Sequence, residues 1–112
     1  MVAPAPGAVV LVRFPFSDLS QTKLRPALVL ADSGRGDWIL CQITSKPYGD
    51  SGAVLLERAS FQTGSLRLTS YARPGKLFTA NQDLIFGSVA QLTPEAHGRV
   101  TAAVVAILRA GA

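Results

Sequence analysis

Two short segments of the chain contain the side chains best suited to chemistry. The first ends in Arg25, which the following Pro26 holds in an extended backbone conformation. The second contains two adjacent hydroxyl groups, on Thr44 and Ser45. A guanidinium group stays charged at any working pH and presents a planar fork of donors that matches phosphate oxygens, while a hydroxyl both donates and accepts. These groups favour chemistry at a phosphate, provided that the fold brings the two segments together.

Both residues also have a purely structural interpretation. Arg25 is then a surface charge beside a structural proline, and the Thr44 hydroxyl caps the end of a strand. A threonine is not a general base at its ordinary pKa, so the proton acceptor stays open. The single histidine, His97, lies in a helical pattern, which favours packing or a helix-surface position over an acid–base role.

The elements that must position these groups are mostly strands. Residues 8–14 are β-branched and apolar on both faces, which predicts a buried strand. Pro26 is expected to open the strand at 27–31, and a turn at 32–37 leads into the strand at 38–44. Further, shorter strands are predicted at 53–57, 66–73, 77–80 and 84–89.

Alternation along the strand at 38–44 separates its side chains into two sets, because successive residues of a strand point to opposite faces. One set is Ile39, Cys41 and Ile43, and the other is Trp38, Leu40, Gln42 and Thr44.

The C-terminal segment has a different pattern. Thr93 suits an N-cap and Pro94 the first helical position. Apolar residues then recur at helical spacing at Val100, Val104 and the pair 107–108. Many short strands and one terminal helix predict a mainly β fold, a strongly bent sheet or partly open barrel closed by the helix.

Composition limits the class of protein. The 112 residues are 48% hydrophobic and 16% charged, which predicts one globular domain at 7–112 after a flexible tail at 1–6. No apolar run is long enough to span a membrane and the N-terminus does not resemble a signal peptide, so we expect a cytoplasmic protein. The net charge of +4 favours an anionic partner. Cys41 is the single cysteine and is expected to be a buried thiol; no metal-binding constellation is present, and we expect no cofactor.

Seven short motifs, in this order and spacing, resemble one protein family. They are GAVVLV at 7–12, FPFSD at 14–18, KLRPALVL at 23–30, QITS at 42–45, GSL at 64–66, SYAR at 70–73 and KLFT at 76–79. Together they make the chain similar to the MazF/PemK-like toxins of bacterial toxin–antitoxin systems over about residues 7–109.

This resemblance implies an SH3-like, partly open β-barrel of about five to seven strands with a C-terminal helix, assembled as a homodimer. It implies a metal-independent, sequence-specific endoribonuclease of single-stranded RNA or mRNA that uses 2′-OH attack and leaves a 2′,3′-cyclic phosphate and a 5′-OH. It also implies growth inhibition, and control by a small antitoxin whose acidic tail occupies the RNA groove.

The resemblance assigns the catalytic pair to Arg25 and Thr44, with Ser45 and Arg73 as possible support. Arg73 corresponds to a second phosphate-contacting arginine of some relatives, and a structural role for it is equally expected. Those relatives place a carboxylate two residues later, where this chain has Gly75, so a base is missing at that position.

Further residues are candidates for RNA contact. A basic track is expected from Lys23, Lys46, Arg67 and Lys76, and the loop at 17–24 adds Asp18 and Ser20, although Asp18 also suits a role in stabilising its own loop. Candidate stacking platforms are Phe16, Trp38, Tyr48 and Tyr71, of which Phe16 and Trp38 are at least as well suited to the core.

Other functions are compatible with the same fold. The chain is alternatively a non-catalytic binding module, a gyrase-poisoning toxin like the CcdB group, or a plain RNA-binding barrel. The presence of Arg25 and Thr44 favours cleavage, because a gyrase poison has no need of that pair.

Overall fold

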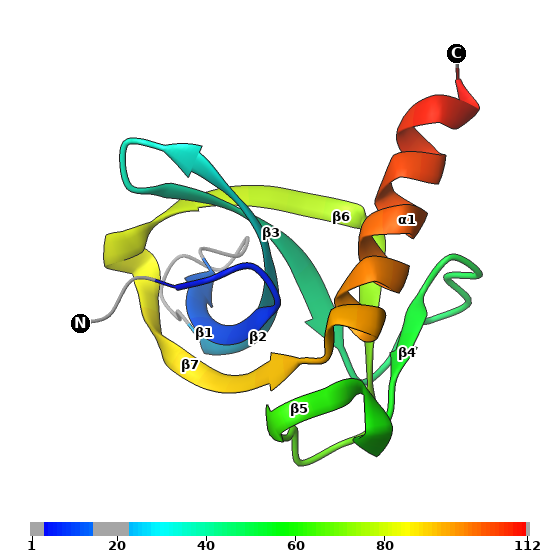
Figure 1. Ribbon diagram of the computed structural model, residues 1–112, viewed down its shortest axis with the longest axis horizontal. Coiled ribbons are helices and arrows are strands. Elements are labelled where there is room, and N and C mark those ends of the chain that lie inside the picture. The colour runs from blue at the N-terminus through cyan, green and yellow to red at the C-terminus, as the bar shows by residue number, and fades with distance from the viewer. Residues whose placement is uncertain (1–3, 15–22, 112) are drawn as a thin grey trace.

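The computed structural model describes residues 4–14 and 23–111, which form a single antiparallel sheet and one long helix (Figure 1). The strands follow the order β4-β6-β3-β2-β1-β7-β5 in the sheet. The elements are β1 (Ala8–Phe14), β2 (Lys23–Gly34), β3 (Asp37–Thr44), β4 (Val54–Leu56), β5 (Phe61–Gly64), β6 (Ser70–Asn81), β7 (Ile85–Leu92) and α1 (Pro94–Ala110), with short 3₁₀ turns at Arg58–Ser60 and Gln82–Leu84.

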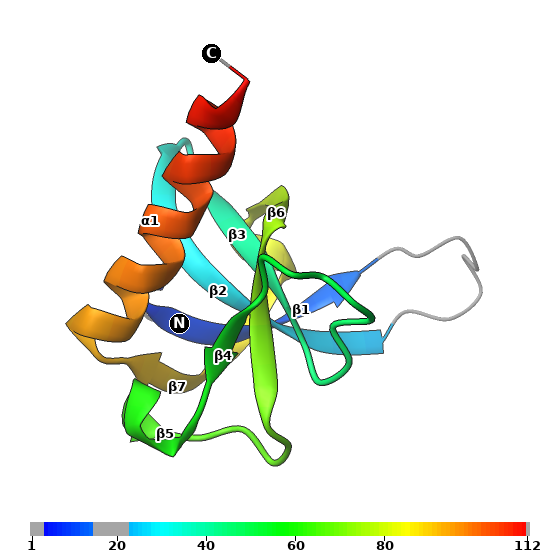
Figure 2. The same ribbon diagram turned by 90° about the vertical axis from the view of Figure 1, so that its right-hand side faces the viewer.

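The sheet curls into a half-barrel, with α1 lying along one side of it (Figure 1). Figure 2 shows the ends of β1 and β2 projecting on the side opposite α1. The predicted mainly β architecture closed by a terminal helix is therefore confirmed. Among residues 4–14 and 23–111, no helix is long and apolar enough to cross a membrane.

Two buried clusters form on opposite faces of the sheet because its central strands are apolar on both faces. Val9 belongs to the cluster that α1 covers, together with Ala96 and Val100 of the helix. Its neighbour Val10 belongs to the second cluster, inside the curl, with Trp38 among its members. The predicted alternation in β3 is confirmed: Cys41 and Ile43 lie in the first cluster, and Trp38 and Leu40 lie in the second.

Strand β2 is longer than predicted. It begins at Lys23 and passes through Pro26, which pairs with Leu11 of β1, so the prediction that Pro26 opens the strand is wrong. A proline in a strand lacks only the N–H donor. The pairing of β2 with β3 begins at Ala27, one residue after the proline.

The strands predicted at 66–73 and 77–80 are one strand, β6, with an irregularity in its middle. The strand begins only at Ser70, so the prediction that residues 66–69 belong to it is wrong. Ala72 pairs with Ile43 and Leu77 with Cys41, so residues 73–76 lie opposite the single residue Gln42. A bulge tolerates the missing N–H of Pro74, which explains why the proline does not end the strand. Strand β5 was not predicted; it pairs with β7 at the edge of the sheet.

The helix begins as predicted. The Thr93 side chain accepts a hydrogen bond from the backbone N–H of Ala96, 3.1 Å away, and Pro94 is the first helical residue. Val100 is fully buried, whereas Leu108, in the last turns, is 71% exposed. The helix therefore packs on the sheet through its first half, and Ile107 and Leu108 extend the apolar stripe into solvent.

Candidate active site

Arg25 lies near the start of β2, where its Cα partner on β1 is Val12. The residue is exposed, and the buried Ala27 follows two positions later on the same face of the strand. Pro26 fixes its own φ and restricts the residue before it, so the backbone that presents the guanidinium group is rigid.

Thr44 is the last residue of β3, where its Cα partner on β6 is Tyr71. Its Oγ1 accepts a hydrogen bond from the backbone N–H of Lys46 at 3.1 Å and donates to the carbonyl oxygen of Lys46 at 3.2 Å. The structural interpretation of Thr44 therefore describes a real contact, in which the hydroxyl caps the strand end. The N–H of Lys46 also orients the oxygen, and the hydroxyl hydrogen can turn to another acceptor.

The register of β2 and β3 brings the two predicted residues together. Ala27 pairs with Gln42, and extending this antiparallel register by two residues places Arg25 opposite Thr44. Both residues line a pocket of about 410 Å³, here called the Arg25 pocket. Its lining residues are Leu11, Arg25, Pro26, Ile43, Thr44, Ser45, Ser65, Leu66, Arg67, Leu68, Ser70 and Val89.

The polar lining of the Arg25 pocket consists of two guanidinium groups and several hydroxyl groups. Ser45 and Arg67, both predicted site residues, are exposed and line it with the pair. Among the described lining residues none has a carboxylate or an imidazole. Such a site stabilises negative charge rather than shuttling protons through an ionisable side chain.

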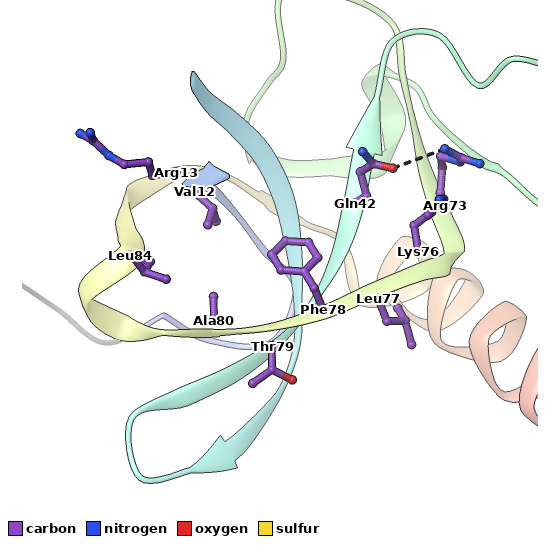
Figure 3. Close-up of a pocket in the computed structure, with 10 residues that line it drawn as sticks. All are labelled: Val12, Arg13, Gln42, Arg73, Lys76, Leu77, Phe78, Thr79, Ala80 and Leu84. Atoms are coloured by element: carbon purple, nitrogen blue, oxygen red, sulfur yellow. Dashed lines mark hydrogen bonds between the residues drawn. The ribbon is translucent and has the colours of Figure 1, made fainter. Parts of the chain in front are cut away.

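Arg73 does not line the Arg25 pocket. It lines a second pocket of about 490 Å³, here called the Arg73 pocket, in the company of Lys76 and Gln42 (Figure 3). Its Nε donates to Asp50 Oδ2 at 2.8 Å and its Nη1 donates to Gln42 Oε1 at 3.4 Å. The remaining lining residues are Val12, Arg13, Leu77, Phe78, Thr79, Ala80 and Leu84.

Neighbouring residues of β1 line the two pockets. Leu11 lines the Arg25 pocket, and Val12, the next residue of β1, lines the Arg73 pocket on the opposite face of the sheet. By alternation Arg25 and Thr44 share a face with Val12 and Gln42. Arg25 and Thr44 line the Arg25 pocket, and on their strands they lie two residues or one pairing step from residues that line the Arg73 pocket.

Asp50 is a functional candidate that sequence reasoning missed. It lies in the loop after β3 and supplies Arg73 with the carboxylate that Gly75 does not. The hydrogen bond from Arg73 holds the pKa of Asp50 below its ordinary value, and the backbone N–H of Gly52 adds to this effect. The turn residues around Asp50 indicated a loop, but nothing in their spacing indicated a partner 23 positions away.

The other predicted RNA contacts are dispersed. Lys76 lines the Arg73 pocket, and Lys46 is exposed in the loop after β3, where its backbone contacts Thr44. Lys23 begins β2, but its side chain lies outside the described residues, as do Asp18 and Ser20.

The aromatic candidates divide in the same way. Trp38 is buried in the second cluster, so its structural interpretation holds. Tyr48 is 84% exposed on the loop after β3, and Tyr71 is half-buried on β6. Phe16 lies outside the described residues, while Phe78, which was not singled out from the sequence, lines the Arg73 pocket.

His97 and Cys41 lie outside the polar lining of both pockets. His97 is half-buried near the start of α1, and burial lowers its pKa. Burial raises the pKa of the Cys41 thiol to about 12. Its Sγ donates to the carbonyl oxygen of Arg73 at 3.1 Å, so this thiol is structural, as predicted. In the part of the chain that the structure describes, no three His, Cys, Asp or Glu side chains gather where they could hold a metal ion.

Comparison with known proteins gives one family and a consistent set of folds. The family model described as the PemK-like, MazF-like toxin of type II toxin–antitoxin systems matches residues 5–108. No curated protein sequence matches the chain significantly.

Solved structures share the fold at low identity. MazE-MazF (Form-III) from Deinococcus radiodurans has a TM-score of 0.75 at 18% identity, covering 96% of this chain and 97% of that chain. An endoribonuclease in complex with its cognate antitoxin, from a Mycobacterial species, has a TM-score of 0.72 at 18% identity, covering 96% and 95%. The Mycobacterium tuberculosis toxin MazF-mt6 has a TM-score of 0.67 at 14% identity, covering 87% and 91%. The predicted barrel-like fold is thereby confirmed.

Proposed function

Because the chain belongs to the PemK-like, MazF-like toxins of type II toxin–antitoxin systems, we propose that it is a metal-independent, sequence-specific endoribonuclease of single-stranded RNA. The observation that carries this proposal is that Arg25 and Thr44, far apart in sequence, line one pocket with Ser45 and Arg67. The neighbouring folds include structures titled as endoribonucleases, which supports the same class of activity.

The reaction needs only groups of the RNA as nucleophile and leaving group. The ribose 2′-oxygen forms a bond to the adjacent phosphorus as the bond from phosphorus to the 5′-oxygen breaks. The 2′-hydroxyl proton leaves to solvent, and the 5′-oxygen gains a proton from solvent. The products are a 2′,3′-cyclic phosphate and a 5′-hydroxyl, so the step balances without a metal ion, an oxidant or a cofactor.

Arg25 is proposed to stabilise the negative charge that builds up on the phosphate oxygens in the transition state. Its planar donor fork matches two of these oxygens. Removing one preorganised donor of this kind costs about 2.7–4 kcal/mol in other enzymes, a factor of about 10²–10³ in rate. Arg67, which lines the same pocket, is proposed to bind the RNA backbone.

Thr44 is proposed to position the reacting phosphate. The N–H of Lys46 holds its oxygen in place, so the hydroxyl hydrogen can leave the Lys46 carbonyl and donate to a phosphate oxygen. Ser45 is adjacent on the exposed rim and is proposed to offer a second hydroxyl.

The partners proposed for this activity follow from charge and family. A net charge of +4 suits RNA and also an acidic antitoxin that competes for the same surface. Because messenger RNA is the proposed substrate, the cytoplasm is the proposed site of action. A homodimer is proposed as the working assembly, and light scattering of the purified chain would measure its mass.

The central test is cleavage of an unstructured RNA by the purified protein in EDTA. The wild type should leave 2′,3′-cyclic phosphate ends, and Arg25→Ala should lose at least about 10² in rate. Arg99→Ala removes an exposed charge from α1, away from both pockets, and should cut normally. Full activity of Arg25→Ala would refute the site, and gyrase–DNA adducts from a wild type that never cuts RNA would point to the gyrase-poisoning alternative.

A further inference from the structure

The Arg73 pocket is polar at one end and mostly apolar at the other. Figure 3 shows Gln42, Arg73 and Lys76 together at one end, and Val12, Ala80 and Leu84 at the other, where Arg13 also lies. The Phe78 ring lies between the two groups, half-buried and packed against the second core cluster. Thr79 and Leu77 point to the opposite side of β6, as alternation requires.

The polar end is preorganised by two side-chain contacts. Asp50 Oδ2 accepts from Arg73 Nε at 2.8 Å, and Gln42 Oε1 accepts from Nη1 at 3.4 Å. These contacts fix the plane of the guanidinium group, which has five N–H donors and therefore keeps donors for a further acceptor. The Gln42 amide oxygen faces Arg73, so its NH₂ group lies on the side away from the arginine (Figure 3).

The charge at this end suits an anion. Arg73 and Lys76 contribute two positive charges, and Asp50 cancels one of them. Arg13, which also lines the pocket, stacks on Phe86 with 4.9 Å between its Cζ and the ring centroid, and its guanidinium points away from Phe78. The volume of about 490 Å³ falls in the ~300–1,000 Å³ range of ligand sites.

We propose that the Arg73 pocket is a nucleotide subsite, which holds one nucleotide of the RNA beside the scissile one. The base lies against Phe78, its phosphate contacts Arg73 and Lys76, and Gln42 donates to the base edge. Asp50 is a positioning residue, which acts through Arg73. This inference rests on the proposed ribonuclease function, because it takes single-stranded RNA as the ligand.

The position of the pocket favours RNA over a peptide. Gln42 and Thr44 lie two residues apart on the same face of β3, a separation of about 7 Å along the strand. One RNA strand that places its scissile phosphate at Arg25 and Thr44 therefore has a neighbouring nucleotide within reach of Gln42. An acidic peptide has negative charge but lacks a planar ring joined to a phosphate, the combination that the two ends of the pocket match.

Binding is tested first, without any cleavage. The full chain, labelled with ¹⁵N, is titrated with each ribonucleoside 5′-monophosphate, with inorganic phosphate and with an acidic peptide. We expect at least one nucleotide to shift the amide signals of Gln42, Phe78 and Ala80, and Phe78→Leu to weaken it about tenfold. Phe61→Leu, at a half-buried phenylalanine of β5 that lines neither pocket, is the matched control and should bind normally.

Each other outcome of this titration would overturn the inference. These outcomes are nucleotides that shift nothing at Phe78, phosphate that binds as tightly as every nucleotide, or a peptide that alone occupies the pocket. The titration measures binding independently of cleavage. Nucleotide binding by a protein that never cuts RNA would therefore refute the proposed function and still support the nucleotide subsite. Phe78→Leu is preferred to Phe78→Ala because it retains most of the packing against the core.

Cleavage of a randomised RNA pool then tests the role of the pocket and of Asp50. Phe78→Leu should alter base preference at one position beside the cut, with the same 2′,3′-cyclic phosphate ends. Asp50→Asn should raise KM about fivefold with kcat nearly unchanged, and Asp50→Glu should restore KM, a pattern that lost stability does not produce. Unchanged base preference in Phe78→Leu, or an Asp50→Asn enzyme identical to the wild type, would contradict the assignment.

Discussion

The Nε atom of Arg73 lies 2.8 Å from Oδ2 of Asp50, which joins the bulge of β6 to the loop that follows β3. Both side chains are about three-quarters covered, at 25% and 23% exposure. The contact places a carboxylate beside the guanidinium group, even though the residue two positions after Arg73 is Gly75, which has none. Arg73 lines one pocket and Arg25 lines the other.

The Asp50–Arg73 pair predicts an acid-side dependence on pH. The folded-state pKa of Asp50 is depressed, so the pair's stabilisation is present at neutral pH and is lost as the pH falls through that lowered value. An NMR titration of the Asp50 carboxyl carbon should give a midpoint below the ordinary aspartate value of 3.8. In Arg73→Gln the midpoint should rise, since the hydrogen-bond donor that lowers the pKa most is gone. An unmoved midpoint in that variant would show that Arg73 does not hold the carboxylate in solution.

Thr44 should matter for rate far more than for folding. Thr44→Val removes the hydroxyl but keeps the shape, and we expect about a 10²-fold fall in kcat, comparable to losing one transition-state donor. Its free energy of unfolding should change by no more than about 1 kcal/mol, because the bonds to Lys46 are exposed and water can replace them. Thr44→Ser keeps the hydroxyl and should retain most activity. Equal rates for the valine and serine variants would remove Thr44 from the reaction.

Cys41 should resist alkylation in the native protein. With a pKa of about 12, only about one thiol in 10⁴ is a thiolate at pH 8, and the thiolate is the nucleophile. The side chain is also fully buried, so iodoacetamide should modify it only at the rate of unfolding. Mass spectrometry of native and urea-unfolded samples measures the difference. Rapid native modification would mean that β3 and β6 separate readily around the thiol.

Replacing Gly64 and Gly98 by alanine should change the free energy of unfolding in opposite directions. Gly64 has a φ of +68°, and a Cβ there would collide with the carbonyl oxygen of Val89 in β7, so Gly64→Ala should destabilise the fold and disturb β5. Gly98 lies in α1 with nothing within 4 Å of an added Cβ, so Gly98→Ala should stabilise it by about 0.5–1 kcal/mol. Chemical denaturation of the two variants and the wild type measures the free energy of unfolding and tests both predictions. A neutral Gly64→Ala would show that the β5–β7 edge is loosely paired.

Local physics determined several features from the sequence alone. Three of them depend on residues only a few positions apart. These are the alternation in β3, the N-cap at Thr93 followed by Pro94, and the burial of Cys41. The family and the barrel-like fold also followed from the order of short motifs, with Arg25 and Thr44 as the candidate pair. Whether that pair performs catalysis stays a prediction, although one pocket contains both residues.

Only the tertiary structure decided which distant segments meet. The sequence pattern assigned faces to strands, but register is set by pairing between residues far apart, so it did not reveal that residues 73–76 bulge opposite Gln42. That bulge keeps β6 continuous through Pro74 and turns Arg73 toward Asp50. The separation of Arg25 from Arg73, and the second pocket that contains Phe78, follow from this long-range pairing, which no local propensity encodes.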